Sequence, residues 1–189
     1  MHIGLYFGSF NPIHIGHLII AEFVANNTDV QQVWFVVSPH NPLKSEASLL
    51  NEYNRLHLVN LAIEDNDKLK ATDVEFKLAR PSYTIDTLTY LQEKYPANQF
   101  SIILGSDSYQ NLPKWKNADV LKRDYAFIVY QRPGHLVQPE PEVKASVLDA
   151  PLLEISATQI RKFIKNNTST RYILPEKVRT EIEANRYYK

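Results

Sequence analysis

The chain has 189 residues, and its 21 lysines and arginines balance its 21 aspartates and glutamates, so the formal net charge is zero. This length suits a single domain with a substantial core, and the balanced charge argues against a general nucleic-acid-binding protein, whose surface is basic. The lack of cysteine excludes disulfides and thiolate chemistry, and without an apolar run long enough for a membrane span or a secretory signal we expect a cytoplasmic protein with no membrane partner.

The first expected elements are an apolar strand over residues 3–7, a loop, and a helix with apolar periodicity. Where they join stands the segment Gly8-Ser9-Phe10-Asn11-Pro12-Ile13-His14-Ile15-Gly16-His17. The first turn of a helix presents unpaired N–H groups that suit a phosphate, and Gly8 and Ser9 let the backbone approach a ligand closely. His14 and His17 are three residues apart and can donate hydrogen bonds to one group. The segment therefore predicts a phosphate site; a metal site is the weaker alternative, because no cysteine or clear third ligand stands nearby.

Strand-like and helical patterns then alternate along the chain. Continuous apolar runs predict strands that are buried on both faces, and broad apolar stripes predict amphipathic helices. The predicted strands cover residues 32–37, 71–76, 100–104 and 125–130, and the predicted helices cover residues 52–63 and 84–95. This alternation predicts an α/β fold over residues 1–189, a single Rossmann-like domain with a doubly wound parallel sheet and helices on both faces. Ligands of such sheets bind beyond the carboxyl ends of the strands, where the glycine and histidine segment lies.

The C-terminal part, about residues 156–189, is expected to be helical. The preceding residues 132–151 are rich in proline and predict a loop with a short strand. Ser156, followed three residues later by Gln159, forms a capping-box pattern at a helix start, and a last helix is expected over residues 175–187. A plain helix cap with a solvated Arg161 is one interpretation. The other is a second anion site, in which a helix N-terminus, two hydroxyls and an arginine cradle a pyrophosphate.

Together, these two segments resemble the signatures of the nucleotidyltransferase superfamily. Its H-x-G-H motif is similar to His14–His17, and its I-S-S-T-x-I-R motif is similar to Ile155–Arg161. The usual aspartate before the proline is Asn11 here, and the usual second serine is Ala157. The resemblance implies a nucleotidyltransferase fold in which both segments bind the phosphates of ATP. The ATP-binding residues that it implies are Gly8, Ser9, Phe10, His14, Gly16, His17, Gly105, Asp107, Ser156, Thr158 and Arg161.

Further segments resemble the bacterial nicotinate mononucleotide adenylyltransferases within that superfamily. They are Ser38-Pro39-His40-Asn41-Pro42-Leu43-Lys44, Pro81-Ser82-Tyr83-Thr84-Ile85-Asp86-Thr87-Leu88, and Gly105-Ser106-Asp107 with Leu112-Pro113-Lys114-Trp115. From the residues alone, Lys44 could equally be a solvated charge and Trp115 a packing residue. The resemblance implies instead that Lys44 approaches the transferring phosphates, that Thr84 helps to bind the nicotinate carboxylate and that Trp115 stacks on the pyridine ring. It also implies that Asp107 contacts a ribose or positions the ligands, which makes the substrate-binding set Lys44, Thr84, Asp107 and Trp115.

The reaction that the resemblance implies is transfer of the adenylyl group of ATP to nicotinate mononucleotide, which gives nicotinate adenine dinucleotide and pyrophosphate in NAD biosynthesis. The implied catalytic residues are His14, His17, Lys44 and Arg161, and Mg²⁺ is expected to be carried by ATP phosphates and water. The alternative acceptors are nicotinamide mononucleotide or another phosphorylated acceptor such as phosphopantetheine. A nucleotide-binding module without catalysis is a further alternative, because Asn11 and Ala157 depart from the motifs. The sequence leaves the oligomeric state open, with a homo-oligomer among the outcomes.

Overall fold

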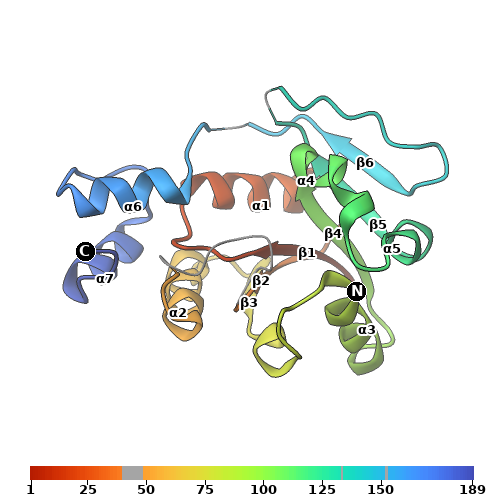
Figure 1. Cartoon of the computed structure of the whole chain (residues 1–189), viewed down its shortest axis with the longest axis horizontal. Helices are drawn as coiled ribbons and strands as arrows, with labels where there is room; N and C mark the ends of the chain where they lie inside the picture. Colours follow the sequence, from red (N-terminus) through yellow and green to blue (C-terminus); the bar gives the residue numbers. More distant parts are fainter. Residues whose placement is uncertain (40–48, 133, 152) are drawn as a thin grey trace.

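The chain folds around one parallel β-sheet (Figure 1). The computed structural model describes residues 1–39, 49–132, 134–151 and 153–189. Within these residues the sheet has six strands, which are, in spatial order, β3 (Leu69–Thr72), β2 (Gln32–Val37), β1 (His2–Gly8), β4 (Gln99–Gly105), β5 (Ala126–Tyr130) and β6 (Ala145–Leu148). The order reverses direction between β1 and β4, as in doubly wound nucleotide-binding folds. The predicted fold class is confirmed.

Helices cover both faces of the sheet, because successive side chains of the buried strands point to opposite faces. On one face, Tyr6 and Phe35 pack with α1 (Ile15–Asn27), α2 (Glu52–Ile63), α6 (Ala157–Lys165) and α7 (Glu176–Ala184). On the other face, Leu5 and Ile102 pack with α3 (Thr84–Lys94), α4 (Ser106–Gln110) and α5 (Ala118–Asp124). In Figure 1, α6 and α7 form one end of the molecule, and β6 and α5 lie at the other.

The strands and helices with strong periodicity occur where the sequence predicts them. The bounds of β2 and α2 are as predicted, and β6 is the short strand expected within residues 132–151. The strand predicted over residues 71–76 is wrong from Asp73 onward, because β3 ends at Thr72 and a 3-10 turn (η1, Val74–Lys77) follows. The last helix, α7, has Pro175 as its N-cap and ends at Ala184.

The central strands part at their carboxyl ends. β1 pairs with β4 only as far as Tyr6 and Ile103, whereas β1 stays paired with β2 up to Gly8 and β4 stays paired with β5 up to Gly105. The last two residues of β1 and β4 therefore diverge at the point where the strand order reverses. Ligands of open α/β sheets bind at such a point.

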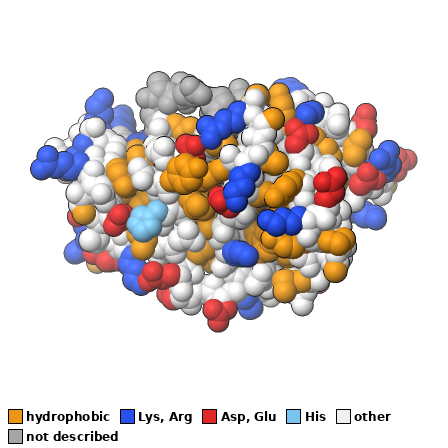
Figure 2. Space-filling model, turned by 90° about the horizontal axis from the view of Figure 1, so that it is seen from below, with side chains coloured by type: hydrophobic (Ala, Val, Ile, Leu, Met, Phe, Trp, Pro, Cys, Tyr) orange, Lys and Arg blue, Asp and Glu red, His pale blue; other side chains and the backbone are white. Residues whose placement is uncertain are grey.

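The surface has a mixed character. Acidic and basic side chains lie side by side on the face shown in Figure 2, in keeping with the zero net charge. Nowhere in the described part of the chain does a helix combine the length and the apolar character that crossing a bilayer requires.

Candidate active site

The loop after β1 is shaped by the close approach of an aromatic ring. Phe10 has a φ of 43° and is 2% exposed, and its ring packs edge-on against Tyr6, Phe35 and His17. A Cβ on Gly8 would lie 2.8 Å from this ring, so only glycine fits at the end of β1. The Phe10 side chain belongs to the core, so the backbone is the part of this residue that is left to face a ligand.

The two histidines form one stacked unit at the start of α1. His14 is the N-cap of the helix, and its ring centroid lies 3.7 Å from that of His17 with an interplanar angle of 27°. The backbone N–H of His14 donates to Nδ1 of His17 at 3.2 Å, so neutral His17 carries its proton on Nε2. Gly16 lies against the pair, since a Cβ there would be 3.1 Å from Nδ1 of His14.

His14 is held in its neutral form. Its residue is 6% exposed, and burial lowers its pKa from 6.5 to about 4, with a further contribution from the charge of Arg132. A neutral imidazole keeps one N–H to donate without the cost of a buried charge. At neutral pH, His14 is therefore suited to hydrogen-bonding an anionic oxygen.

Asn11, which stands where aspartate is usual, is 5% exposed and connects three parts of the site. Its Oδ1 accepts from the backbone N–H of Leu50 at 3.1 Å, and its backbone carbonyl accepts from Arg161 at 2.7 Å. The peptide bond to Pro12 is cis. An amide oxygen serves as the acceptor that Leu50 requires without adding a buried charge, which accounts physically for the substitution.

The second motif meets the first through Arg161. Ser156 is the N-cap of α6, and its hydroxyl accepts from the backbone N–H of Gln159 at 3.2 Å, so the predicted cap is confirmed. Arg161 donates from one terminal nitrogen to the Asn11 carbonyl and from the other to the Thr158 hydroxyl at 3.2 Å. Segments 150 residues apart thus lie at one edge of the sheet.

The glycine at the end of β4 allows an ion pair to form over the backbone. Nε of Arg132 lies 3.3 Å from the Asp107 carboxylate. A Cβ on Gly105 would lie 2.5 Å from that carboxylate and 2.8 Å from Nε, so a larger residue would force the pair apart. Arg132 also donates to the Tyr130 hydroxyl at 3.1 Å. The charge of Asp107 is therefore balanced within the site.

The residues expected at the pyridine ring lie beside one another on the other face of the sheet. Thr84 is the first residue of α3, and the N-cap is Tyr83. The ammonium group of Lys116, next to Trp115, lies 2.8 Å from the Asp86 carboxylate and 4.8 Å from the Tyr83 ring centroid. This ion pair fastens the half-buried Trp115 loop to the start of α3. Lys44 lies outside the described residues.

Two buried ionisable residues near the site are not predicted from the sequence. Arg55 of α2 is 0% exposed and donates to backbone carbonyls of the loops after β1 and β2. Glu75 is 2% exposed and accepts from the Thr87 hydroxyl at 2.9 Å, and burial raises its pKa. Each sits in a stretch without glycine or a recognisable motif, so the sequence offers no local signal for either.

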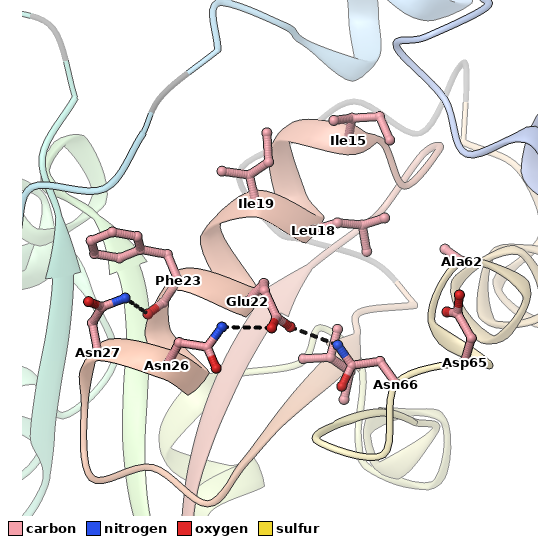
Figure 3. Close-up of a pocket in the computed structure, with 11 residues that line it drawn as sticks. Ile15, Leu18, Ile19, Glu22, Phe23, Asn26, Asn27, Ala62, Asp65 and Asn66 are labelled. Atoms are coloured by element: carbon pink, nitrogen blue, oxygen red, sulfur yellow. Dashed lines mark hydrogen bonds between the residues drawn. The ribbon is translucent and has the colours of Figure 1, made fainter.

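A surface groove of about 530 Å³ lies apart from this arrangement, between α1 and the end of α2 (Figure 3). Ile15, Leu18, Ile19 and Phe23 line it from α1, and Glu22 accepts from the side-chain amides of Asn26 and Asn66, at 2.7 Å each. None of the predicted site residues within the described ranges lines it. The residues of the two predicted phosphate motifs lie instead near the carboxyl end of β1, where Arg161 donates to the Asn11 carbonyl.

The comparisons with known proteins agree with this geometry. The family model described as cytidylyltransferase-like matches residues 5–163. Proteins named "Probable nicotinate-nucleotide adenylyltransferase" from Flavobacterium psychrophilum and Flavobacterium johnsoniae are 50% and 47% identical to this chain, and each match covers the whole of both chains. A solved Plasmodium falciparum nicotinic acid mononucleotide adenylyltransferase, complexed with NaAD, matches with a TM-score of 0.83 at 22% identity, over 99% of this chain and 97% of that one. At this identity, the structural likeness concerns the fold.

Proposed function

Because the chain belongs to the cytidylyltransferase-like family and, within it, to the nicotinate-nucleotide adenylyltransferases, we propose that ATP and nicotinate mononucleotide bind side by side at the diverging carboxyl ends of β1 and β4. The reaction forms a bond between a phosphate oxygen of the mononucleotide and the α-phosphorus of ATP, and it breaks the bond from that phosphorus to pyrophosphate. The products are nicotinate adenine dinucleotide and pyrophosphate. Positioning and charge stabilisation supply most of the catalysis in such transfers.

The stacked histidines act on the phosphates nearest the reacting bond. Negative charge grows on the oxygen between the α- and β-phosphorus as the bond breaks, and N–H donors of His14 and His17 stabilise it. The neutral state of His14 suits this role, because a neutral imidazole keeps an N–H that can donate to an anionic oxygen at the helix start. Backbone groups of Gly8, Ser9, Phe10 and Gly16 line the same side.

The second motif holds the leaving pyrophosphate. Arg161 and Thr158 are joined at the start of α6, where Ser156 caps the helix. Arg161 offers a planar fork of donors that matches phosphate oxygens. Lys44 approaches the transferring phosphates from the loop after β2, and Mg²⁺ arrives with ATP, held by phosphates and water.

The acceptor lies toward α3 and the Trp115 loop. Thr84 and the unpaired N–H groups of the first turn of α3 bind the nicotinate carboxylate. Trp115 stacks on the pyridine ring, and Asp107 meets a ribose. We further propose that the enzyme works in the cytoplasm.

The observation that carries the proposal is the hydrogen bond from Arg161 to the Asn11 carbonyl, because it joins two phosphate motifs into one site. The test is release of pyrophosphate from ATP and Mg²⁺ with nicotinate mononucleotide, nicotinamide mononucleotide or phosphopantetheine as acceptor. We expect the highest kcat/KM with nicotinate mononucleotide. A preference for phosphopantetheine would contradict the acceptor assignment, and ATP binding without pyrophosphate release with any acceptor would indicate an inactive nucleotide-binding module.

A further inference from the structure

Arg55 makes an unusual set of contacts for a fully buried arginine. Its Nε donates to the carbonyl of Leu50 at 2.7 Å, and its terminal nitrogens donate to the carbonyls of Ser9, Ser38 and Pro39 at 2.5, 2.8 and 3.0 Å. Four of the five guanidinium N–H groups are thus accounted for by backbone oxygens. None of these four acceptors is a carboxylate.

The four carbonyls belong to three segments around the site. Ser9 lies in the first phosphate motif, Ser38 and Pro39 follow β2, and Leu50 precedes α2. One side chain therefore fastens the first motif both to the end of β2 and to the start of α2.

The hydrogen bond from Arg55 to the Ser9 carbonyl also fixes the direction of the next backbone N–H in the loop after β1. In a trans peptide, the N–H points away from the C=O of the same unit. Because the Ser9 carbonyl faces Arg55, the N–H of Phe10 points away from it and is left for other acceptors. Arg55 thereby sets the orientation of a backbone donor in the phosphate motif without touching a phosphate.

Arg55 also keeps its charge in this environment. Burial lowers its pKa to about 10, so it remains protonated at neutral pH. Glu52 raises this pKa but pairs directly with Arg80, at 2.8 Å. Burying a charge without a directly paired carboxylate costs free energy. In the proposed arrangement this charge lies behind the triphosphate site, where a positive charge favours the phosphates.

We propose that Arg55 is a positioning residue for adenylyl transfer: it fixes the loop after β1, which holds the first phosphate motif, relative to the end of β2 and the start of α2, so that the two histidines keep their place against the triphosphate. This inference rests on the proposed function. Lysine cannot replace the arginine, because an ammonium group is a point donor and does not span four carbonyls. Both Arg55→Lys and Arg55→Met are therefore expected to misplace the loops.

The experiment compares these variants with Leu58→Ala, a fully buried position on the same helix that packs in the core. Kinetics are measured at a temperature where circular dichroism shows each variant folded. We expect kcat to fall about tenfold to hundredfold in both Arg55 variants, as for a misplaced reacting group. KM for the mononucleotide and the kcat of Leu58→Ala should stay within about twofold of wild type. Wild-type kcat in Arg55→Lys, or an equal loss in Leu58→Ala, would overturn the proposal.

If the Arg55 variants do not fold, a measurement on the wild-type protein tests the proposal instead. The Nε resonance of Arg55 should shift when α,β-methylene-ATP binds, because its carbonyl partners border the phosphates; an unchanged resonance in the saturated complex contradicts the positioning role. Failure of the proposed function would look different, because the wild-type enzyme would then release no pyrophosphate with nicotinate mononucleotide.

Discussion

Lowering the pH from 7 to 5 should destabilise the folded protein through His14. In the unfolded chain this imidazole takes up a proton near its usual pKa of 6.5, whereas in the folded protein its pKa is about 4, chiefly because it is buried. The unfolded state therefore binds more protons in this range, so the stabilisation is complete above pH 6.5 and is lost as the pH falls toward 4. At 1.36 kcal/mol per pH unit, the gap corresponds to about 3 kcal/mol in total, of which roughly 2 kcal/mol disappears between pH 7 and 5.

The assay is urea unfolding of the wild type and of His14→Gln at pH 7, 6 and 5. Glutamine does not titrate. The free energy that the substitution loses by removing the stacking and packing of His14 is therefore the same at each pH. The unfolding free energy of the wild type minus that of His14→Gln should decrease by roughly 2 kcal/mol from pH 7 to pH 5, because only the wild type loses this stabilisation. A difference that stays constant within about 0.5 kcal/mol would refute the reasoning that His14 is buried in its neutral form.

Three substitutions test other parts of the site. His17→Ala should lower turnover by about 10² or more, as for loss of one transition-state donor; turnover within a few-fold of wild type would remove His17 from the catalytic groups. Trp115→Ala should raise KM for the mononucleotide while KM for ATP changes little, and equal effects on both would indicate a packing role. Gly105→Ala places a Cβ 2.5 Å from the Asp107 carboxylate, so urea unfolding should show a loss of about 1–3 kcal/mol; unchanged stability would mean that Asp107 and Arg132 move apart freely.

The sequence predicts best those elements whose local pattern and tertiary role agree. Residues 32–37 form a nearly continuous apolar run, residues 52–63 carry a broad apolar stripe, and both elements occur with the predicted bounds. The two short helices after β4, α4 and α5, are absent from the prediction because five and seven residues carry too little periodicity. The strand expected over residues 71–76 stops early because the Asp73 carbonyl accepts from the N–H of Phe76 and turns the chain.

The candidate site likewise contains residues that the sequence predicts and residues that it does not predict. The two phosphate motifs are readable because glycine, histidine and helix caps occupy fixed positions at strand and helix ends. Arg55 and Glu75 are not readable, since their roles arise only when the loops around them come together in space. The interpretation of Asn11 also needed the fold, because its partners are Leu50 and Arg161, far away in sequence.

The bond from Arg161 to the loop after β1 has a consequence for the order in which the enzyme is made. The first phosphate motif leaves the ribosome early, but the cation that braces it is added 150 residues later. Throughout most of synthesis, the nascent chain therefore lacks the arginine that joins the two motifs. Their common arrangement can be completed only after almost the entire polypeptide has been translated.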